Sequence, residues 1–264
     1  MQNRAEAEKQ RQPPSGQEGW GWVNPLAGPE DFLAGQGRHV LVTRPQPGLG
    51  RTMAALKGAG WQAVAAPALA ITPVPAPGEG FWRTLLAAGC KAVALTSAQA
   101  LPFLANAPRT LPLWVVGVKT AYQARQAGFG AVVTASGTAQ ALAQLCRQHG
   151  LVGGRVRLLT GRGDDGTLYN SALAGELQAE RLLAYSVSHA QALPERALAL
   201  ARARQVHAAV FYSSESVRAF LKAWPGGESA LLRGVEAWCL SSAIAGVAAP
   251  NAPWGQVAVM TDAP

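Results

Sequence analysis

The chain has 264 residues, of which 49% are hydrophobic and 14% are charged. This composition excludes a disordered protein, and the length suits either one large α/β domain or two small ones. The formal net charge of +8, from 23 Lys and Arg against 15 Asp and Glu, favours an anionic partner, which could be nucleic acid, a membrane surface or a polycarboxylated small molecule.

The residue pattern narrows these classes of partner. Basic residues are scattered singly, without runs or interleaved aromatic side chains, which argues against nucleic acid. No apolar run approaches the roughly 18 residues of a membrane span, and the N-terminus lacks a signal-peptide core. We therefore expect a cytoplasmic protein that binds neither nucleic acid nor membrane.

The cysteines and histidines give no sign of a metal or redox site. Cys90, Cys146 and Cys239 are far apart and fit no CxxC spacing, so we expect reduced, structural thiols. The four histidines are dispersed without metal-ligand spacing. The sequence therefore predicts no metal and no cofactor.

Residues 1–37 are rich in Gln, Glu, Gly and Pro without sustained periodicity, and they predict a disordered or loosely docked N-terminal extension in which Trp20 and Trp22 are candidates for docking. From Arg38 onward, short β-rich apolar runs alternate with Ala- and Leu-rich segments of helical period. Strands are expected at 39–45, 61–67, 91–97, 112–120, 131–136, 155–161, 181–189, 207–214, 236–242 and 256–260. Helices are expected at 49–60, 81–90, 98–107, 121–128, 138–150, 167–176, 194–204 and 215–224. This alternation predicts an α/β protein with two doubly wound parallel sheets.

An internal repeat supports a division into two lobes. The segments "KAVALTSAQALPFLA" and "HAAVFYSSESVRAFL" share one plan, in which a buried strand, a hydroxyl pair and an amphipathic helix follow one another. Each is preceded by a strand that ends near arginine, "VLVTRP" or "RLLTGRG", and followed by a hydroxyl-rich turn, "VVGVKTAYQA" or "WCLSSAIAGV". Polar residues at the carboxyl ends of strands in two similar lobes predict a cleft between them.

In this order and at these spacings, the motifs resemble those of the uroporphyrinogen-III synthase family. They are "VLVTRP", "LTSAQAL", "VVGVKTAYQARQAGF", "LLTGRGDDGTL", "LLAYSVSH", "FYSSESVRAF" and "LSSAIAG", and together they run from about His39 to the end of the chain. One departure is "WCLSSA", which lacks the glycine of the family's usual Ile-Gly-x-Thr turn and has serine in place of its threonine.

The resemblance implies two flavodoxin-like lobes joined by a two-stranded tether, with the active cleft between the lobes. Lobe 1 would comprise residues 38–68 and 190–264, and lobe 2 residues 71–186. The tether strands would be 69–75 and 182–189.

The implied reaction is cyclisation of the linear tetrapyrrole hydroxymethylbilane with inversion of its last pyrrole ring, through loss of water and a spiro intermediate. Selectivity for the inverted product then depends mainly on holding the flexible substrate in the geometry of an otherwise disfavoured attack. It depends less on a strong acid or nucleophile. The acetate and propionate arms of the substrate would suit a basic cleft. We expect a monomer that makes transient contact with the preceding enzyme of the pathway.

By the same resemblance, Tyr185 is the catalytic candidate, because its phenol could assist departure of the terminal hydroxyl group. The expected substrate-binding residues are Arg44, Thr96, Ser97, Thr120, Gly161, Arg162, Gly163, Ser213, Ser214, Ser241 and Ser242. The alternative role of the hydroxyl side chains is ordinary helix N-capping, and both roles can hold at one helix start.

Two other functions fit parts of the sequence. A non-catalytic protein that binds a polycarboxylate or a tetrapyrrole would show the same cleft and charge. A nucleotide-binding enzyme is suggested by "GLGRTM", but Met53 occupies the third glycine position of G-x-G-x-x-G, and Pro45 and Pro47 interrupt the tight turn that this motif requires.

Overall fold

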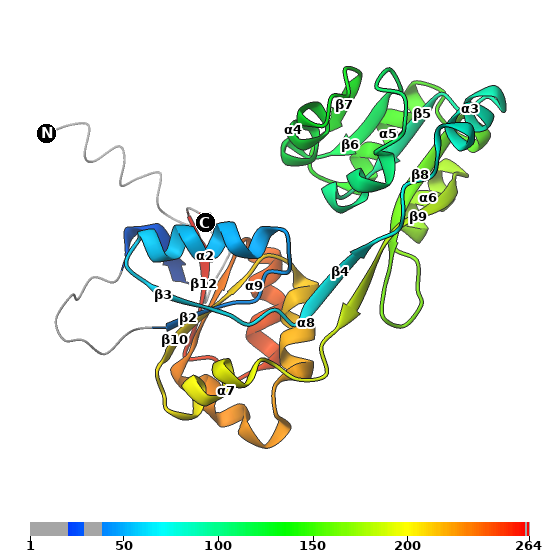
Figure 1. Ribbon diagram of the computed structural model, residues 1–264. Helices are drawn as coiled ribbons and strands as arrows, with labels where there is room; N and C mark the ends of the chain where they lie inside the picture. The colour runs from blue at the N-terminus through cyan, green and yellow to red at the C-terminus, as the bar shows by residue number, and fades with distance from the viewer. Residues whose placement is uncertain (1–20, 29–38, 262, 264) are drawn as a thin grey trace, which may run out of the picture. The chain divides into compact units, whose positions relative to one another are not determined.

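The structure, a computed structural model, describes residues 21–28, 39–261 and 263. The chain forms two compact units. Unit 1 comprises residues up to Leu69 and from His189 onward, and unit 2 comprises Ala70–Ser188. Each unit is built around one six-stranded sheet with helices packed on it (Figure 1). Two mostly parallel α/β sheets confirm the predicted fold class.

The sheet of unit 1 has the strand order β1-β12-β11-β10-β2-β3, and all five of these strand pairings are parallel. Its strands are β1 (Gly21–Val23), β2 (His39–Val42), β3 (Gln62–Ala65), β10 (Val206–Phe211), β11 (Glu236–Cys239) and β12 (Gln256–Met260). Its α-helices are α2 (Gly48–Gly58), α7 (Glu195–Arg202), α8 (Ser214–Ala223) and α9 (Ser242–Ala248). The 3-10 helices η1 (Pro25–Ala27), η4 (Gly226–Gly234) and η5 (Ala249–Asn251) complete this unit.

The sheet associated with unit 2 has the order β4-β9-β8-β5-β6-β7. Its strands are β4 (Leu69–Pro73), β5 (Ala92–Leu95), β6 (Leu113–Val116), β7 (Val132–Ala135), β8 (Val156–Arg162) and β9 (Glu180–His189). Its α-helices are α3 (Glu79–Ala87), α4 (Val118–Gln126), α5 (Ala139–Gln148) and α6 (Ser171–Leu177), and its 3-10 helices are η2 (Ala98–Leu104) and η3 (Gly153–Arg155).

Strands β4 and β9 contain the points at which the chain passes from one unit to the other. The Ala190 N–H donates to the Ala68 carbonyl, and the Val74 N–H donates to the Ala184 carbonyl, both at 2.9 Å. Because residue numbers fall along one strand as they rise along its neighbour, β4 and β9 are antiparallel. They are the exception in an otherwise parallel arrangement.

The two sheets share one strand layout, although the chain visits the corresponding strands in a different order in each. Counted along the chain without β1, the sheet of unit 1 has the order 2-1-3-4-5, which is the flavodoxin-like order. Unit 2 gives the same layout when β8 is counted first, so that β8, β9, β5, β6 and β7 take the places of β2, β3, β10, β11 and β12. The repeat in the sequence is therefore a repeat of sheet architecture in permuted order.

Several elements differ from the sequence prediction, among them α9, which the predicted helices omit, and α4, which begins at Val118 within the strand expected over 112–120. The helix expected over 167–176 begins only at Ser171, because Asn170 adopts a left-handed conformation with φ 59° and ψ 32°. Strand β1 was not expected, since it lies within the segment 1–37, and it pairs with β12 along Gly21–Val23. Trp22 in this strand is 44% exposed, whereas Trp20 lies outside the described residues.

Residues 21–28 are anchored to unit 1 by more than the strand pairing. The indole Nε1 of Trp61 donates to the Pro25 carbonyl at 2.8 Å, and the Pro25 side chain is buried. Trp61 itself packs edge-on against Trp238 within the core of β2, β10, β11 and β12. This segment therefore covers part of the hydrophobic core of unit 1.

Candidate functional site

Each unit has a topological switch point, at which successive connections leave in opposite directions from neighbouring strands. In unit 1 it lies between β2 and β10, and in unit 2 between β8 and β5. In open α/β sheets, ligands bind outside the carboxyl ends of the strands at such a point. Residues that bind a ligand are therefore expected at the carboxyl ends of these four strands.

Tyr185 lies on β9, and an irregularity in strand pairing sets its position. Leu183 is aligned with Thr160 of β8, but the next aligned pair is Tyr185 with Gly161, so that Ala184 has no partner of its own on β8. Such a bulge adds one residue to one strand and redirects the side chains that follow it. It brings the tyrosine opposite the glycine at the carboxyl end of β8.

The ring of Tyr185 packs directly over Gly161. A Cβ added at Gly161 would overlap the edge of the ring, lying 2.5 Å from its Cζ atom. The tyrosine is only 7% exposed, and its hydroxyl forms a hydrogen bond with the side chain of Ser97 after β5. Burial raises the pKa of Tyr185, with the Ser97 bond acting in the opposite direction, so the phenol keeps its proton throughout the neutral range. Three predicted residues therefore meet at the switch point of unit 2.

Thr96, Arg162 and Gly163 are neighbours in the chain of Ser97 and Gly161. The Thr96 hydroxyl accepts a hydrogen bond from Asn170 Nδ2 at 3.0 Å, which links the end of β5 to the start of α6. After Gly161 the chain turns back on itself, because the Gly163 N–H donates to the Thr167 carbonyl at 2.9 Å. Arg162 in this turn is exposed.

In unit 1, Arg44 follows β2 at the switch point and is held by neighbours from two other elements. Its Nη1 donates to Thr52 Oγ1 of α2 at 3.1 Å, and its guanidinium carbon lies 4.4 Å from the centroid of the Tyr212 ring, which follows β10. A Cβ added at Gly48 would lie 2.6 Å from that same guanidinium carbon. We name Arg44, Gly48, Thr52 and Tyr212 the Arg44 cluster.

Tyr212 is half-buried in the Arg44 cluster. Thr52 Oγ1 lies 3.5 Å from its hydroxyl oxygen. Burial raises the pKa of Tyr212, against the influence of its hydrogen bonds to Thr52 and Arg44 and of the positive charges of Arg44 and Arg51. The tyrosine is therefore neutral at physiological pH, beside two cations.

The hydroxyl groups at helix starts have different surroundings. Ser213 caps α8 in a reciprocal capping box with Ser216, whereas Ser241 at the start of α9 makes no side-chain capping bond. Ser214 and Ser242 are the first residues of these two helices and are partly exposed. Thr120 is only 7% exposed and lies in the first turn of α4, which Gly117 caps.

Thr52, Asn170 and Tyr212 are among the residues that contact predicted site residues but were not themselves predicted. The tyrosine had a recognisable signal, since it follows the apolar run "HAAVF" and occupies the repeat position of Thr96. The contact between Arg44 and Tyr212 joins residues far apart in the chain, so no local pattern indicates it.

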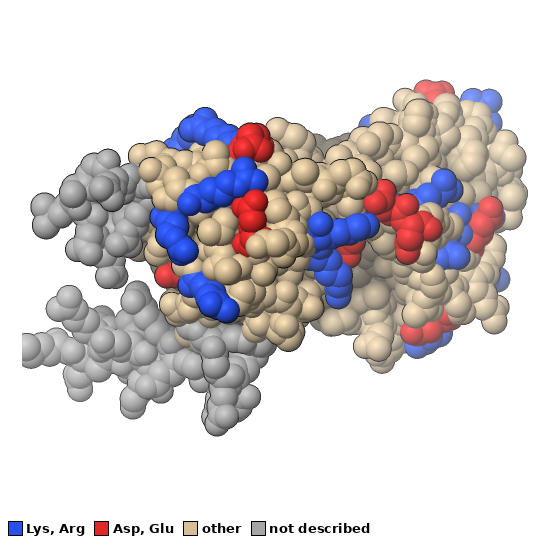
Figure 2. All heavy atoms as spheres, turned by 90° about the horizontal axis from the view of Figure 1, so that it is seen from below, with Lys and Arg blue, Asp and Glu red and all other residues tan. Residues whose placement is uncertain are grey.

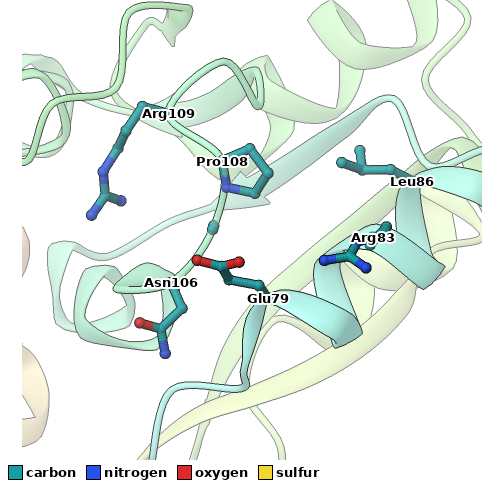
Figure 3. A pocket seen from close by; sticks show the side chains of 7 residues that line it. Glu79, Arg83, Leu86, Asn106, Pro108 and Arg109 are labelled. Carbon is teal, nitrogen blue, oxygen red and sulfur yellow. The ribbon is translucent and has the colours of Figure 1, made fainter.

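A pocket of about 430 Å³ in unit 2 lies away from these residues. Glu79, Arg83 and Leu86 project from α3, across from Asn106, Pro108 and Arg109 of the segment that follows η2 (Figure 3). None of the predicted site residues lines it. Arg109 is bonded to the Leu104 and Ala105 carbonyls and lies over the Phe129 ring, so it stabilises the local fold.

On the face drawn in Figure 2, basic and acidic side chains are interspersed among larger neutral areas. Among residues 21–28 and 39–261, no three His, Cys, Asp or Glu side chains gather as a metal site requires. None of the described helices combines the length and apolar character of a membrane span.

The fold and the candidate site define a class of protein, a two-unit α/β protein with a flavodoxin-like sheet in each unit and polar groups gathered at both switch points. A family model described as "Uroporphyrinogen-III synthase HemD" matches residues 50–259. The chain therefore belongs to the uroporphyrinogen-III synthase family, as its motifs predicted.

A solved structure agrees with this assignment at the level of fold. A selenomethionine derivative of a mutant uroporphyrinogen III synthase from the bacterium Thermus thermophilus is 17% identical, with a TM-score of 0.55, and the match covers 86% of this chain and 93% of that one. The wild-type protein from the same bacterium, in another crystal form, is also 17% identical, with a TM-score of 0.43 and coverage of 85% and 91%. No curated protein matches the chain.

Proposed function

We propose that the protein is a cyclising hydro-lyase that converts hydroxymethylbilane into uroporphyrinogen III, with loss of water and inversion of the last pyrrole ring. The observation that carries this proposal is the family match over residues 50–259. The placement of Tyr185, Gly161 and Ser97 together at one switch point supports it.

The reaction begins with departure of the terminal hydroxyl group, which leaves a cation delocalised over a pyrrole ring. Direct closure of this cation, with loss of a proton, gives the type I isomer, whereas attack from the substituted position of the last ring gives a spiro intermediate that opens and recloses, with loss of a proton, to the type III isomer. The two routes share one cation, so the enzyme selects between geometries and needs no strong nucleophile.

Tyr185 is the proposed donor to the departing hydroxyl. A phenol that keeps its proton at neutral pH can give a hydrogen bond or a proton to an oxygen that gains negative charge. Its ring is held over Gly161 and its hydroxyl by Ser97, which favours one orientation of the O–H group. The carboxylate arms of the substrate are bound by Arg44, by Arg162 and by the hydroxyl and backbone N–H groups at the predicted strand ends.

The test is an isomer assay on freshly prepared hydroxymethylbilane, followed by oxidation and separation of the uroporphyrins. We expect the type III isomer from the wild-type protein, at a rate above spontaneous closure. Type I product alone, formed at the spontaneous rate, would contradict the proposed function and leave a non-catalytic binding protein as the remaining candidate.

Tyr185→Phe tests the role of the phenol. It keeps the ring over Gly161 and removes the hydroxyl, so we expect kcat to fall roughly 10²-fold with little change in fold, which is the low end for acid catalysis. The control is Tyr122→Phe, because Tyr122 on α4 of the same unit is 63% exposed. An unchanged kcat in Tyr185→Phe would remove Tyr185 from the chemistry.

We further propose that the protein works in the cytoplasm as a monomer and meets the preceding enzyme of the pathway only transiently. Light scattering of the purified chain should give the mass of one copy, 27.4 kDa. A stable dimer would contradict this part of the proposal.

A further inference from the structure

We infer that Tyr212 is a positioning residue, which holds the Arg44 guanidinium in place to bind a carboxylate group of the substrate. The inference rests on the proposed function and extends it to a side chain that was not among the predicted site residues. It follows from the contacts of the Arg44 cluster at the switch point of unit 1.

Arg44 is restrained from three directions. Its guanidinium lies over the face of Tyr212, its Nη1 is bonded to Thr52, and its side chain lies against Gly48, where any larger residue would collide with it. A guanidinium has five N–H donors, so the bond to Thr52 leaves others for a ligand. A side chain held in this way loses little conformational freedom when a ligand binds, and preorganisation of this kind increases affinity.

The electrostatic surroundings of the cluster favour an anion. Gly48 begins α2, an 11-residue helix that has no acidic residue in its first turn and no side-chain cap. The N–H groups of its first turn add the positive end of the helix dipole to the charges of Arg44 and Arg51. Stacking on an aromatic face holds a guanidinium without neutralising its charge, whereas an ion pair with a carboxylate would neutralise it. A substrate carboxylate is the anion that the proposed reaction supplies.

The contacts with Tyr212 and Gly48 provide two independent ways to displace Arg44. Tyr212→Leu removes the aromatic face, and Gly48→Ala inserts a methyl group into the space that the guanidinium occupies. For each variant we expect KM for hydroxymethylbilane to rise about five- to tenfold, with kcat nearly unchanged, because the lost contact binds substrate and transition state alike. Tyr212→Phe keeps the ring but loses the contacts of the hydroxyl with Thr52 and Arg44, so its KM should lie between those of the wild type and Tyr212→Leu.

Matched controls separate this effect from general damage. Gly50 lies in the same helix with no atom within 4 Å of an added Cβ, so Gly50→Ala should leave KM unchanged. Phe129 supports a second guanidinium stack, with Arg109 at 4.7 Å and outside the candidate site, so Phe129→Leu should also leave KM unchanged.

The decisive comparison repeats Tyr212→Leu in a chain that carries Arg44→Met. If Tyr212 acts through Arg44, the change in KM disappears in this background, whereas a purely structural role gives the same change in both backgrounds. Equal changes in the two backgrounds, or an unchanged KM in Gly48→Ala, would overturn the inference. Failure of the proposed function is seen separately, because the wild-type protein would then form no excess of type III isomer.

Discussion

Replacement of Gly161 by alanine is the sharpest perturbation of the group around Tyr185. The new Cβ would lie 2.5 Å from Cζ and 2.9 Å from Cδ2 of the tyrosine ring, both well inside van der Waals contact. Gly161 is buried, and the two residues are aligned on neighbouring strands, so the backbone cannot separate without disturbing the pairing of β8 and β9. The ring must therefore move, and its hydrogen bond with Ser97 is lost or lengthened.

The expected cost of this overpacking is about 1–3 kcal/mol of unfolding free energy. For a folding unit of the size of unit 2, this loss of unfolding free energy corresponds to a fall in Tm of roughly 4–12 °C. Because the phenol is displaced, we also expect kcat for type III product to fall at least as far as in Tyr185→Phe, about 10²-fold.

The assay combines calorimetry with isomer analysis of the product. Gly130→Ala is the control, since an alanine there meets no atom within 4 Å and the backbone has no positive φ. A Gly161→Ala chain with wild-type Tm and wild-type isomer selectivity would refute the proposed packing of Tyr185 on the glycine.

Two further predictions concern stability. Ser213→Ala breaks the capping box of α8 and should cost about 1 kcal/mol in urea unfolding, whereas Ser241→Ala at the uncapped start of α9 should cost less; equal losses would contradict the assigned caps. Burial raises the pKa of the Cys239 thiol to about 12, so the folded chain holds a proton that the unfolded chain releases above pH 9. The free energy of unfolding should therefore fall by on the order of 2 kcal/mol between roughly pH 9 and 10.5, and it should fall less in the Cys239→Ala variant. A pH profile identical in the two chains would show that this thiol does not contribute.

The fold was largely predictable because its elements carry strong local patterns. Strands such as β5 and β6 are short, continuously apolar runs, and their alternation with helices favours parallel sheets. β1 was missed because a three-residue strand in a Gly- and Pro-rich segment forms only through pairing with β12. The late start of α6 was missed because Asn170 gives little sign in the sequence of its left-handed conformation.

The candidate site was predictable only in part. The strand patterns placed Ser97, Gly161 and Arg44 at the ends of predicted strands, and the resemblance to the family made them site candidates. The bulge at Ala184 depends on the register between two distant segments, and the stack of Arg44 on Tyr212 depends on the neighbouring positions of β2 and β10. These features are products of tertiary structure, which a linear pattern does not encode.

The pairing of β1 with β12 bears on how shortened versions of the protein would behave. A chain begun at His39 would lose β1, the Pro25 carbonyl that receives the Trp61 indole N–H, and the cover that Pro25 gives to the core. It would leave β12 as an unprotected edge strand with an apolar sequence, "QVAVM", which is the kind of edge on which other chains add strands and aggregate. Expression trials that trim the N-terminus should therefore stop before Gly21, even though the catalytic candidates lie far beyond it in the sequence.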